Sequence, residues 1–103
     1  RAQNPQKVLL QQKINPSNAT VREFEWILET LRNRCLNSQS TIVTTLVRAW
    51  RTVQRSGYKV SLLQLSRQIA DFSNIAFQAR KNQKFDFDKL VSKILKDKYP
   101  PKK

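Results

Sequence analysis

The sequence predicts an all-α fold, a bundle of four main helices, and three observations support this prediction. The 103 residues include one Gly, and the four Pro residues, Pro5, Pro16, Pro100 and Pro101, lie near the two ends. Apolar residues in between recur at steps of three and four, the period of an amphipathic helix. Ser, Thr or Asp precedes these segments at capping positions. Residues 17–99 are therefore expected to form helices joined by short turns, within a single domain that has one core.

The first helix is predicted from Thr20 to Leu36. Thr20 and Glu23 have the spacing of a capping box. One apolar stripe consists of Val21, Phe24, Ile27, Leu28, Leu31 and Cys35. The sequence leaves open a short extra helix between Gln6 and Ile14. Residues 1–17 and 99–103 are otherwise expected to be tail-like.

The second helix is predicted from Ser40 to Ser56. The β-branched run at 41–45 favours a strand locally, but helical spacing continues for three further turns, and we let the period decide. The apolar face consists of Val43, Leu46, Val47, Trp50 and Val53. Gly57 is expected to end the helix.

The third and fourth helices are predicted from Ser61 to Lys81 and from Asp86 to Lys98. Ser61 and Gln64 again have capping-box spacing, and Asp86 can cap the fourth helix. The third helix leaves a narrow polar arc of Arg67, Asp71, Asn74 and Gln78, and Ile75 is assigned to its apolar side. Such a helix is expected to pack centrally against more than one neighbour. The inward residues of the fourth helix are Phe87, Leu90, Val91, Ile94 and Leu95.

The charge is strongly unbalanced. Twenty Lys and Arg face seven Asp and Glu, which gives a net charge of +13. A basic balance of this size in a short chain indicates a polyanionic partner, above all nucleic acid. A merely basic surface is the simpler alternative, although self-repulsion then destabilises the fold without compensation.

The basic residues concentrate in an acid-free stretch. No Asp or Glu lies between Thr30 and Ala70. Within it Arg48, Arg51 and Arg55 lie at i, i+3 and i+7, a row about 10 Å long that can follow successive phosphates. The full set predicted to contact nucleic acid is Arg48, Arg51, Arg55, Lys59 and Arg67, with Arg80, Lys81 and Lys84 as a second cluster.

The first helix carries a different surface. Glu23, Glu25 and Glu29 supply three of the seven acidic residues, and Trp26 lies opposite the apolar stripe. Carboxylates disfavour an approaching phosphate. We therefore expect Trp26, Glu25 and Glu29 to contact another protein subunit.

Catalytic chemistry is not predicted. The chain has no His, one Cys and one Gly, which removes the commonest general base and leaves no glycine-rich phosphate loop. Cys35 lies on an apolar stripe and is expected to be a buried, inert thiol. No metal and no cofactor are expected. A lone Cys fits a reducing compartment, and no apolar run is long enough to span a bilayer, so a cytoplasmic protein without membrane contact is expected.

Two alternative functions remain open. The segment 65–73 looks like the start of a helix-turn-helix, with Asn74 and Gln78 directed at base edges. Ala70 and Asp71 stand where that turn favours Gly, and the apolar stripe continues past them. The second alternative is a subunit whose positive charge meets an acidic protein.

The chain resembles the small helical subunit of type I-D CRISPR effector complexes, which matches the C-terminal helical domain of the large subunit. The resemblance rests on 46–51, which reads LVRAWR, on 55–57, which reads RSG, and on the long apolar third helix. It implies a non-catalytic subunit of an RNA-guided ribonucleoprotein that holds the guide–target duplex or the displaced strand without reading sequence. By this resemblance Arg48, Arg51 and Arg55 contact the backbone, and Trp26 suits contact between subunits, further copies included.

Overall fold

The computed structural model describes residues 18–101 and confirms the all-α prediction. Its four helices are α2 (Asn18–Arg34), α3 (Gln39–Arg55), α4 (Leu62–Ala79) and α5 (Phe87–Lys98). The described part of the chain contains no strand, only an isolated bridge between Cys35 and Phe85. The possible helix between Gln6 and Ile14 lies outside these residues.

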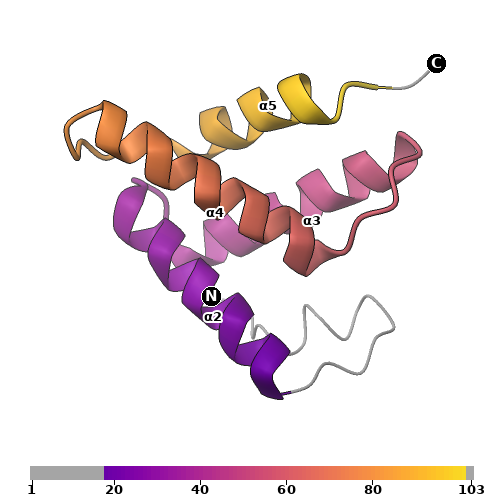
Figure 1. Ribbon diagram of the computed structural model, residues 1–103, viewed down its shortest axis with the longest axis horizontal. Coiled ribbons are helices and arrows are strands. Elements are labelled where there is room, and N and C mark those ends of the chain that lie inside the picture. The colour runs from indigo at the N-terminus through magenta and orange to yellow at the C-terminus, as the bar shows by residue number, and fades with distance from the viewer. Residues whose placement is uncertain (1–17, 102–103) are drawn as a thin grey trace.

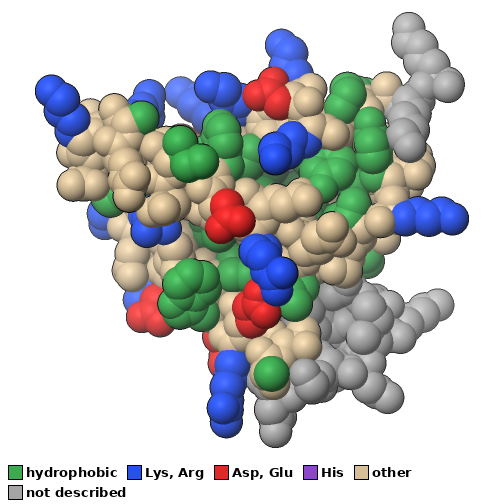
Figure 2. Space-filling model, in the orientation of Figure 1, with side chains coloured by type: hydrophobic (Ala, Val, Ile, Leu, Met, Phe, Trp, Pro, Cys, Tyr) green, Lys and Arg blue, Asp and Glu red, His purple; other side chains and the backbone are tan. Residues whose placement is uncertain are grey.

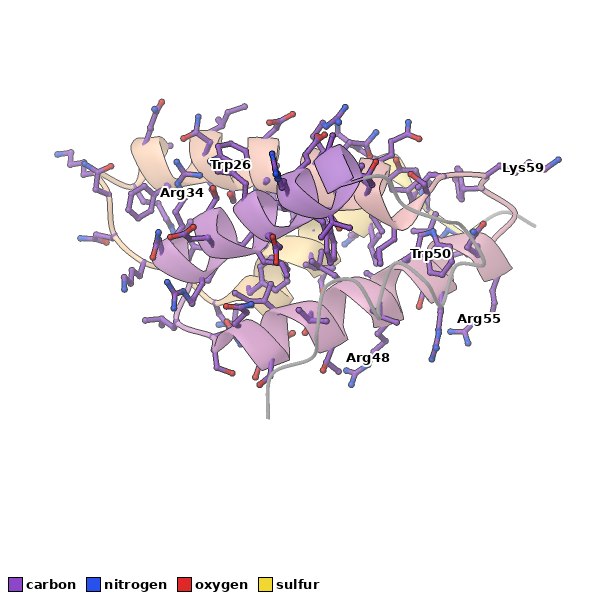
Figure 3. All side chains as sticks on the ribbon, turned by 90° about the horizontal axis from the view of Figure 1, so that it is seen from below. Trp26, Arg34, Arg48, Trp50, Arg55 and Lys59 are labelled. Atoms are coloured by element: carbon purple, nitrogen blue, oxygen red, sulfur yellow. The ribbon has the colours of Figure 1, made fainter. Side chains whose placement is uncertain are left out.

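The helices form two parallel pairs (Figure 1). The α2 and α4 helices run side by side in the same direction, because Glu23 meets Arg67 near their starts and Arg34 lies over the Phe77 ring near their ends. The α3 and α5 helices are joined by a hydrogen bond from Thr45 Oγ1 to Asp88 Oδ1 at 2.9 Å. Figure 3 shows Trp26 of α2 on one side of the bundle and Arg48 and Arg55 of α3 on the other.

The core consists of the apolar stripes predicted for the helices. All six stripe residues of the first helix are buried, from Val21 to Cys35. On the other helices Trp50, Phe72 and Leu95 are half-buried at the edge of the core. One assignment was wrong: the side chain of Ile75, expected on the apolar side of its helix, is 65% exposed, and that of Leu36 at the predicted end of the first helix is 72% exposed. Leu36 lies beyond the last turn of α2, and Ile75 projects from the solvent side of α4.

Two of the three predicted caps hold helix starts, at α4 and α5. The Ser61 side chain accepts a hydrogen bond from Gln64 N at 3.0 Å, and Asp86 Oδ1 accepts one from Asp88 N at 2.9 Å. At α3 the cap is Ser38, two residues before the predicted start. The α2 helix begins at Asn18, so Thr20 lies inside its first turn and does not precede it.

Two helices end in the same motif with different residues at the critical position. After α3, Tyr58 N donates to Val53 O and Gly57 N to Gln54 O. This is the bond pattern of a Schellman motif, with Gly57 at φ 95°. After α4 the same two bonds start from Asn82 N and Lys81 N, and Lys81 adopts φ 58°. A left-handed conformation disfavours a residue that has a Cβ, so Lys81 costs stability that Gly57 does not.

The connections pin distant parts of the chain together. Leu36 N donates to Phe85 O at 3.0 Å, and Asn37 Oδ1 accepts from Phe87 N at 2.8 Å, so the α2–α3 loop holds the start of α5. The C-terminal segment also differs from the tail that was expected. Tyr99 is half-buried with its hydroxyl bonded to Gln68 Oε1, its ring lies edge-on to Tyr58, and the Tyr58 hydroxyl donates to the carbonyl of Pro100.

Candidate nucleic-acid interface

The outer face of α3 presents the predicted arginine row to solvent. Arg48, Arg51 and Arg55 are all exposed, while Leu46 and Val53 on the other face of the helix are buried. Figure 3 shows Arg48 and Arg55 projecting from the same side of the bundle. None of the three forms an ion pair with a described residue. Apolar packing on one face of α3 thus fixes the direction in which three uncompensated charges point.

Hydroxyl groups accompany the arginine row. Arg55 Nη2 donates to Thr52 Oγ1 at 3.4 Å, and Thr52 Oγ1 itself donates to the Arg48 carbonyl at 3.0 Å. Beside Arg48 lies a hollow of about 310 Å³, lined by Ser40, Thr41, Thr44, Thr45, Arg48 and Asp88. Guanidinium and hydroxyl groups are both donors to phosphate oxygens. The outer face of α3 therefore offers phosphate oxygens hydroxyl donors in addition to the three guanidinium groups.

One carboxylate borders this surface. Asp88 of α5 accepts from Thr45 Oγ1 and lines the hollow together with Arg48. A second hollow of about 270 Å³, between α3 and α5, shares Thr45, Arg48 and Asp88 with the first. The negative charge of Asp88 weakens the positive potential near Arg48. Arg51 and Arg55 line neither of these hollows and so lie apart from Asp88. The C-terminal half of the row is thus the more strongly anion-attracting half.

Arg67 does not belong to this row. Its Nε donates to Glu23 Oε2 at 2.6 Å, and this is the one ion pair among the residues that the structure describes. The acid-free stretch of sequence therefore acquires a counter-charge from α2 once the chain folds. Sequence spacing could not reveal this contact, because the two residues are 44 positions apart.

The remaining predicted cations lie at two other places. Lys59 follows the end of α3 and projects from one end of the bundle, away from the Arg48 side chain (Figure 3). Arg80, Lys81 and Lys84 are exposed in the connection between α4 and α5, at the other end of the molecule (Figure 1). The eight predicted residues thus do not form one continuous patch.

Two basic residues that belong with Arg80 were absent from the prediction. Lys89 and Lys93 on α5 line a groove with Arg80 between α4 and α5. Figure 2 shows basic side chains gathered over α5 and the α4–α5 connection. The sequence signal was available, since Lys89 and Lys93 are spaced i, i+4 on the predicted fourth helix.

The two tryptophans have different environments. Trp26 is 64% exposed, and Figure 3 shows it on the side of the bundle away from Arg48 and Arg55. Its neighbours in the prediction, Glu25 and Glu29, are also exposed. Trp50 is half-buried against the core, and its Nε1 donates to the Val60 carbonyl at 2.7 Å. The bundle therefore separates an arginine surface from a tryptophan and glutamate surface.

Cys35 is buried in the core, at the end of α2. Burial, with a smaller contribution from the negative charge of Asp86, raises its pKa from 9.0 to about 12, and nearby Arg34 lowers it only in part. Such a thiol is protonated at neutral pH and is a poor nucleophile and metal ligand. Among residues 18–101, no three His, Cys, Asp or Glu side chains come close enough to hold a metal ion.

The α4 helix continues without a break through Ala70 and Asp71. The segment 65–73 therefore does not contain the turn that a helix-turn-helix requires at this point. Asn74 and Gln78 are exposed on the same continuous helix. None of the described helices combines the length and the apolar character needed to cross a bilayer.

Comparisons with models of protein families, with curated proteins and with solved structures gave no match to this chain. The geometry and charge of the molecule itself are therefore the grounds for assigning a function.

Proposed function

We propose that the outer face of α3 binds the sugar–phosphate backbone of nucleic acid and that the protein catalyses no reaction. One observation supports this most strongly: Arg48, Arg51 and Arg55 lie exposed along one helix face, and none has an ion-pair partner among the described residues. Arginine binds phosphate through two parallel hydrogen bonds. The row covers eight residues, or seven helical steps, and is about 10 Å long, so it can follow successive phosphates.

Binding without sequence preference fits this face better than base reading. The face carries mainly Arg and Thr, which donate to phosphate oxygens, and a single side chain near the row, Gln54, is suited to paired bonds with adenine. Sequence-specific binding by a helix-turn-helix is the alternative. Affinities for a duplex and for its scrambled sequence are expected to agree. A marked loss with the scrambled sequence would favour the alternative.

The resemblance to CRISPR small subunits suggests where such binding takes place. A non-catalytic basic bundle within an RNA-guided ribonucleoprotein would hold the guide–target duplex or the displaced strand by its backbone. The opposite surface, with Trp26, Glu25 and Glu29, would then face a neighbouring protein subunit. Trp is enriched at protein interfaces, so an exposed Trp supports this assignment. Copurification of a tagged chain tests this role, and Trp26→Arg is expected to release protein neighbours while nucleic-acid binding persists.

The direct test of the proposed function is fluorescence anisotropy with a labelled oligonucleotide, in single-stranded and duplex form. The triple variant Arg48→Ala, Arg51→Ala and Arg55→Ala is expected to bind at least about tenfold more weakly, because phosphate contacts dominate such affinities. The matched control removes three exposed charges elsewhere, with Arg22→Ala, Arg32→Ala and Lys98→Ala. Equal binding by the two folded variants would overturn the proposal.

A further inference from the structure

A groove lies between α4 and α5. It is on a different side of α5 from α3, the helix that carries the arginine row. Its floor is apolar, with Phe72 and Ala76 from α4 and Leu90 from α5. The accessible volume is about 220 Å³. Pockets for drug-sized ligands occupy roughly 300–1,000 Å³, so this groove suits a single large side chain. The groove is separate from the two hollows beside α3, because it shares no lining residue with either of them.

Three cations surround the apolar floor. Arg80, Lys89 and Lys93 line the groove, all three are exposed, and none forms an ion pair with a described residue. Lys89 and Lys93 are like charges at i, i+4, an arrangement that destabilises a helix. The single acidic residue of the lining, Asp86, is occupied in part as the cap of α5. The groove therefore combines an apolar slot with an unneutralised positive rim.

We propose that this groove binds an acidic peptide segment of a partner protein through one large apolar side chain. The apolar side chain would lie against Phe72, Ala76 and Leu90, and flanking carboxylates would meet Arg80, Lys89 and Lys93. Lys93 Nζ lies 5.8 Å from the centre of the Phe72 ring, which places one cation of the rim directly beside the apolar floor, where a flanking carboxylate would meet it. The chemistry disfavours a nucleobase as the occupant. The polar groups of the lining are three cations, which can only donate, and Asp86, which already caps α5, so the donor groups of a base edge would find few acceptors there.

The probe for this site is a fluorescently labelled short peptide in which one phenylalanine is flanked on both sides by aspartates and glutamates. Replacing that phenylalanine by alanine is expected to weaken binding at least about tenfold, because the alanine peptide buries much less apolar surface in the groove. Amide NMR shifts on adding the peptide are expected along 72–80 and 86–93. Equal binding of the two peptides would contradict the proposal.

Charge reversal on α5 tests the rim with a matched control. The double variant Lys89→Glu and Lys93→Glu is expected to bind the peptide about tenfold more weakly. The control, Lys96→Glu and Lys98→Glu, changes the net charge equally on exposed residues of the same helix that do not line the groove. Ala76→Met, which fills the slot without changing charge, is expected to weaken binding of the phenylalanine peptide. Equal losses in the groove and control variants would contradict the proposal.

An oligonucleotide competition separates this site from the proposed nucleic-acid surface. A labelled single strand is expected to shift amides of α3 and to leave the bound peptide in place. Displacement of the peptide, with shifts confined to the groove, would assign the groove to nucleic acid and overturn the proposal. The Arg48, Arg51 and Arg55 triple variant is expected to bind the peptide normally. Peptide binding in the groove can therefore be confirmed or contradicted whether or not α3 binds the nucleic-acid backbone.

Discussion

Arg67 and Glu23 form an ion pair that joins α4 to α2, with Arg67 Nε 2.6 Å from Glu23 Oε2. The side chains are 55% and 36% exposed, so solvent screens their attraction. Their pairing removes Arg67 from the set of free cations although the local sequence around it is strongly basic. The pair lies near the starts of both helices, which run parallel.

The first prediction concerns what this ion pair contributes. In a double-mutant cycle with Glu23→Gln and Arg67→Gln, the coupling free energy is expected to be about 0.2–1 kcal/mol, the range of exposed pairs. Urea unfolding of the four proteins measures it. For nucleic-acid affinity, Arg67→Gln is expected to have a smaller effect than Arg51→Gln. A larger effect of Arg67→Gln would show that Arg67 contacts nucleic acid and would contradict its exclusion from the arginine surface.

The second prediction concerns the two Schellman motifs. Lys81→Gly is expected to raise the free energy of unfolding by about 0.5–1 kcal/mol, because Gly reaches the left-handed region without a Cβ penalty. At the equivalent position after α3, Gly57→Ala is expected to lower it by about 1 kcal/mol. Thermal or urea unfolding measures both. Shifts of the same sign in the two variants would contradict this explanation.

The third prediction follows from the raised pKa of Cys35. Below pH 9 the thiol is protonated in both folded and unfolded chains, so it adds no pH dependence. Between pH 9 and about 12 the unfolded chain releases this proton while the folded chain retains it, so stability falls as pH rises. Subtracting the profile of Cys35→Ala isolates this contribution from Tyr and Lys titration. Rapid reaction of the folded protein with a thiol reagent at pH 8 would show that Cys35 is accessible.

The fourth prediction separates the two tryptophans. Trp26→Phe is expected to change the free energy of unfolding by less than about 0.5 kcal/mol, because the side chain lies in solvent. Trp50→Phe removes the hydrogen bond to the Val60 carbonyl and is expected to cost about 1–2 kcal/mol. The fluorescence that remains in Trp50→Phe is expected to be the more easily quenched by acrylamide.

The sequence was a good guide to the helices because their evidence is local. Periodic apolar residues and the caps at Ser61 and Asp86 placed the ends of α4 and α5 within two residues. The failures involve contacts between distant residues. The docking of Tyr99 on Tyr58 and Gln68 cannot be read from spacing, and Ile75 lies on a part of α4 that no neighbour covers.

The site was predictable in the same partial way. A row at i, i+3 and i+7 on an amphipathic helix must point away from the core, so Arg48, Arg51 and Arg55 were placed on one exposed face by their sequence alone. Pairing of Arg67 with Glu23 depends on how α2 packs against α4. The grouping of Arg80 with Lys93 depends in turn on how α4 packs against α5. Local patterns carry no information on such packing.

The salt dependence of nucleic-acid affinity tests the arginine row most directly. The logarithm of the binding constant falls with the logarithm of salt concentration by about 0.7 per phosphate contact for single strands and about 0.9 for duplexes. If Arg48, Arg51 and Arg55 each contact a phosphate, the triple alanine variant is expected to have a slope shallower by about 2–3, and the control variant at Arg22, Arg32 and Lys98 a nearly unchanged one. Equal slopes for the wild-type protein and the triple variant would contradict backbone binding by α3.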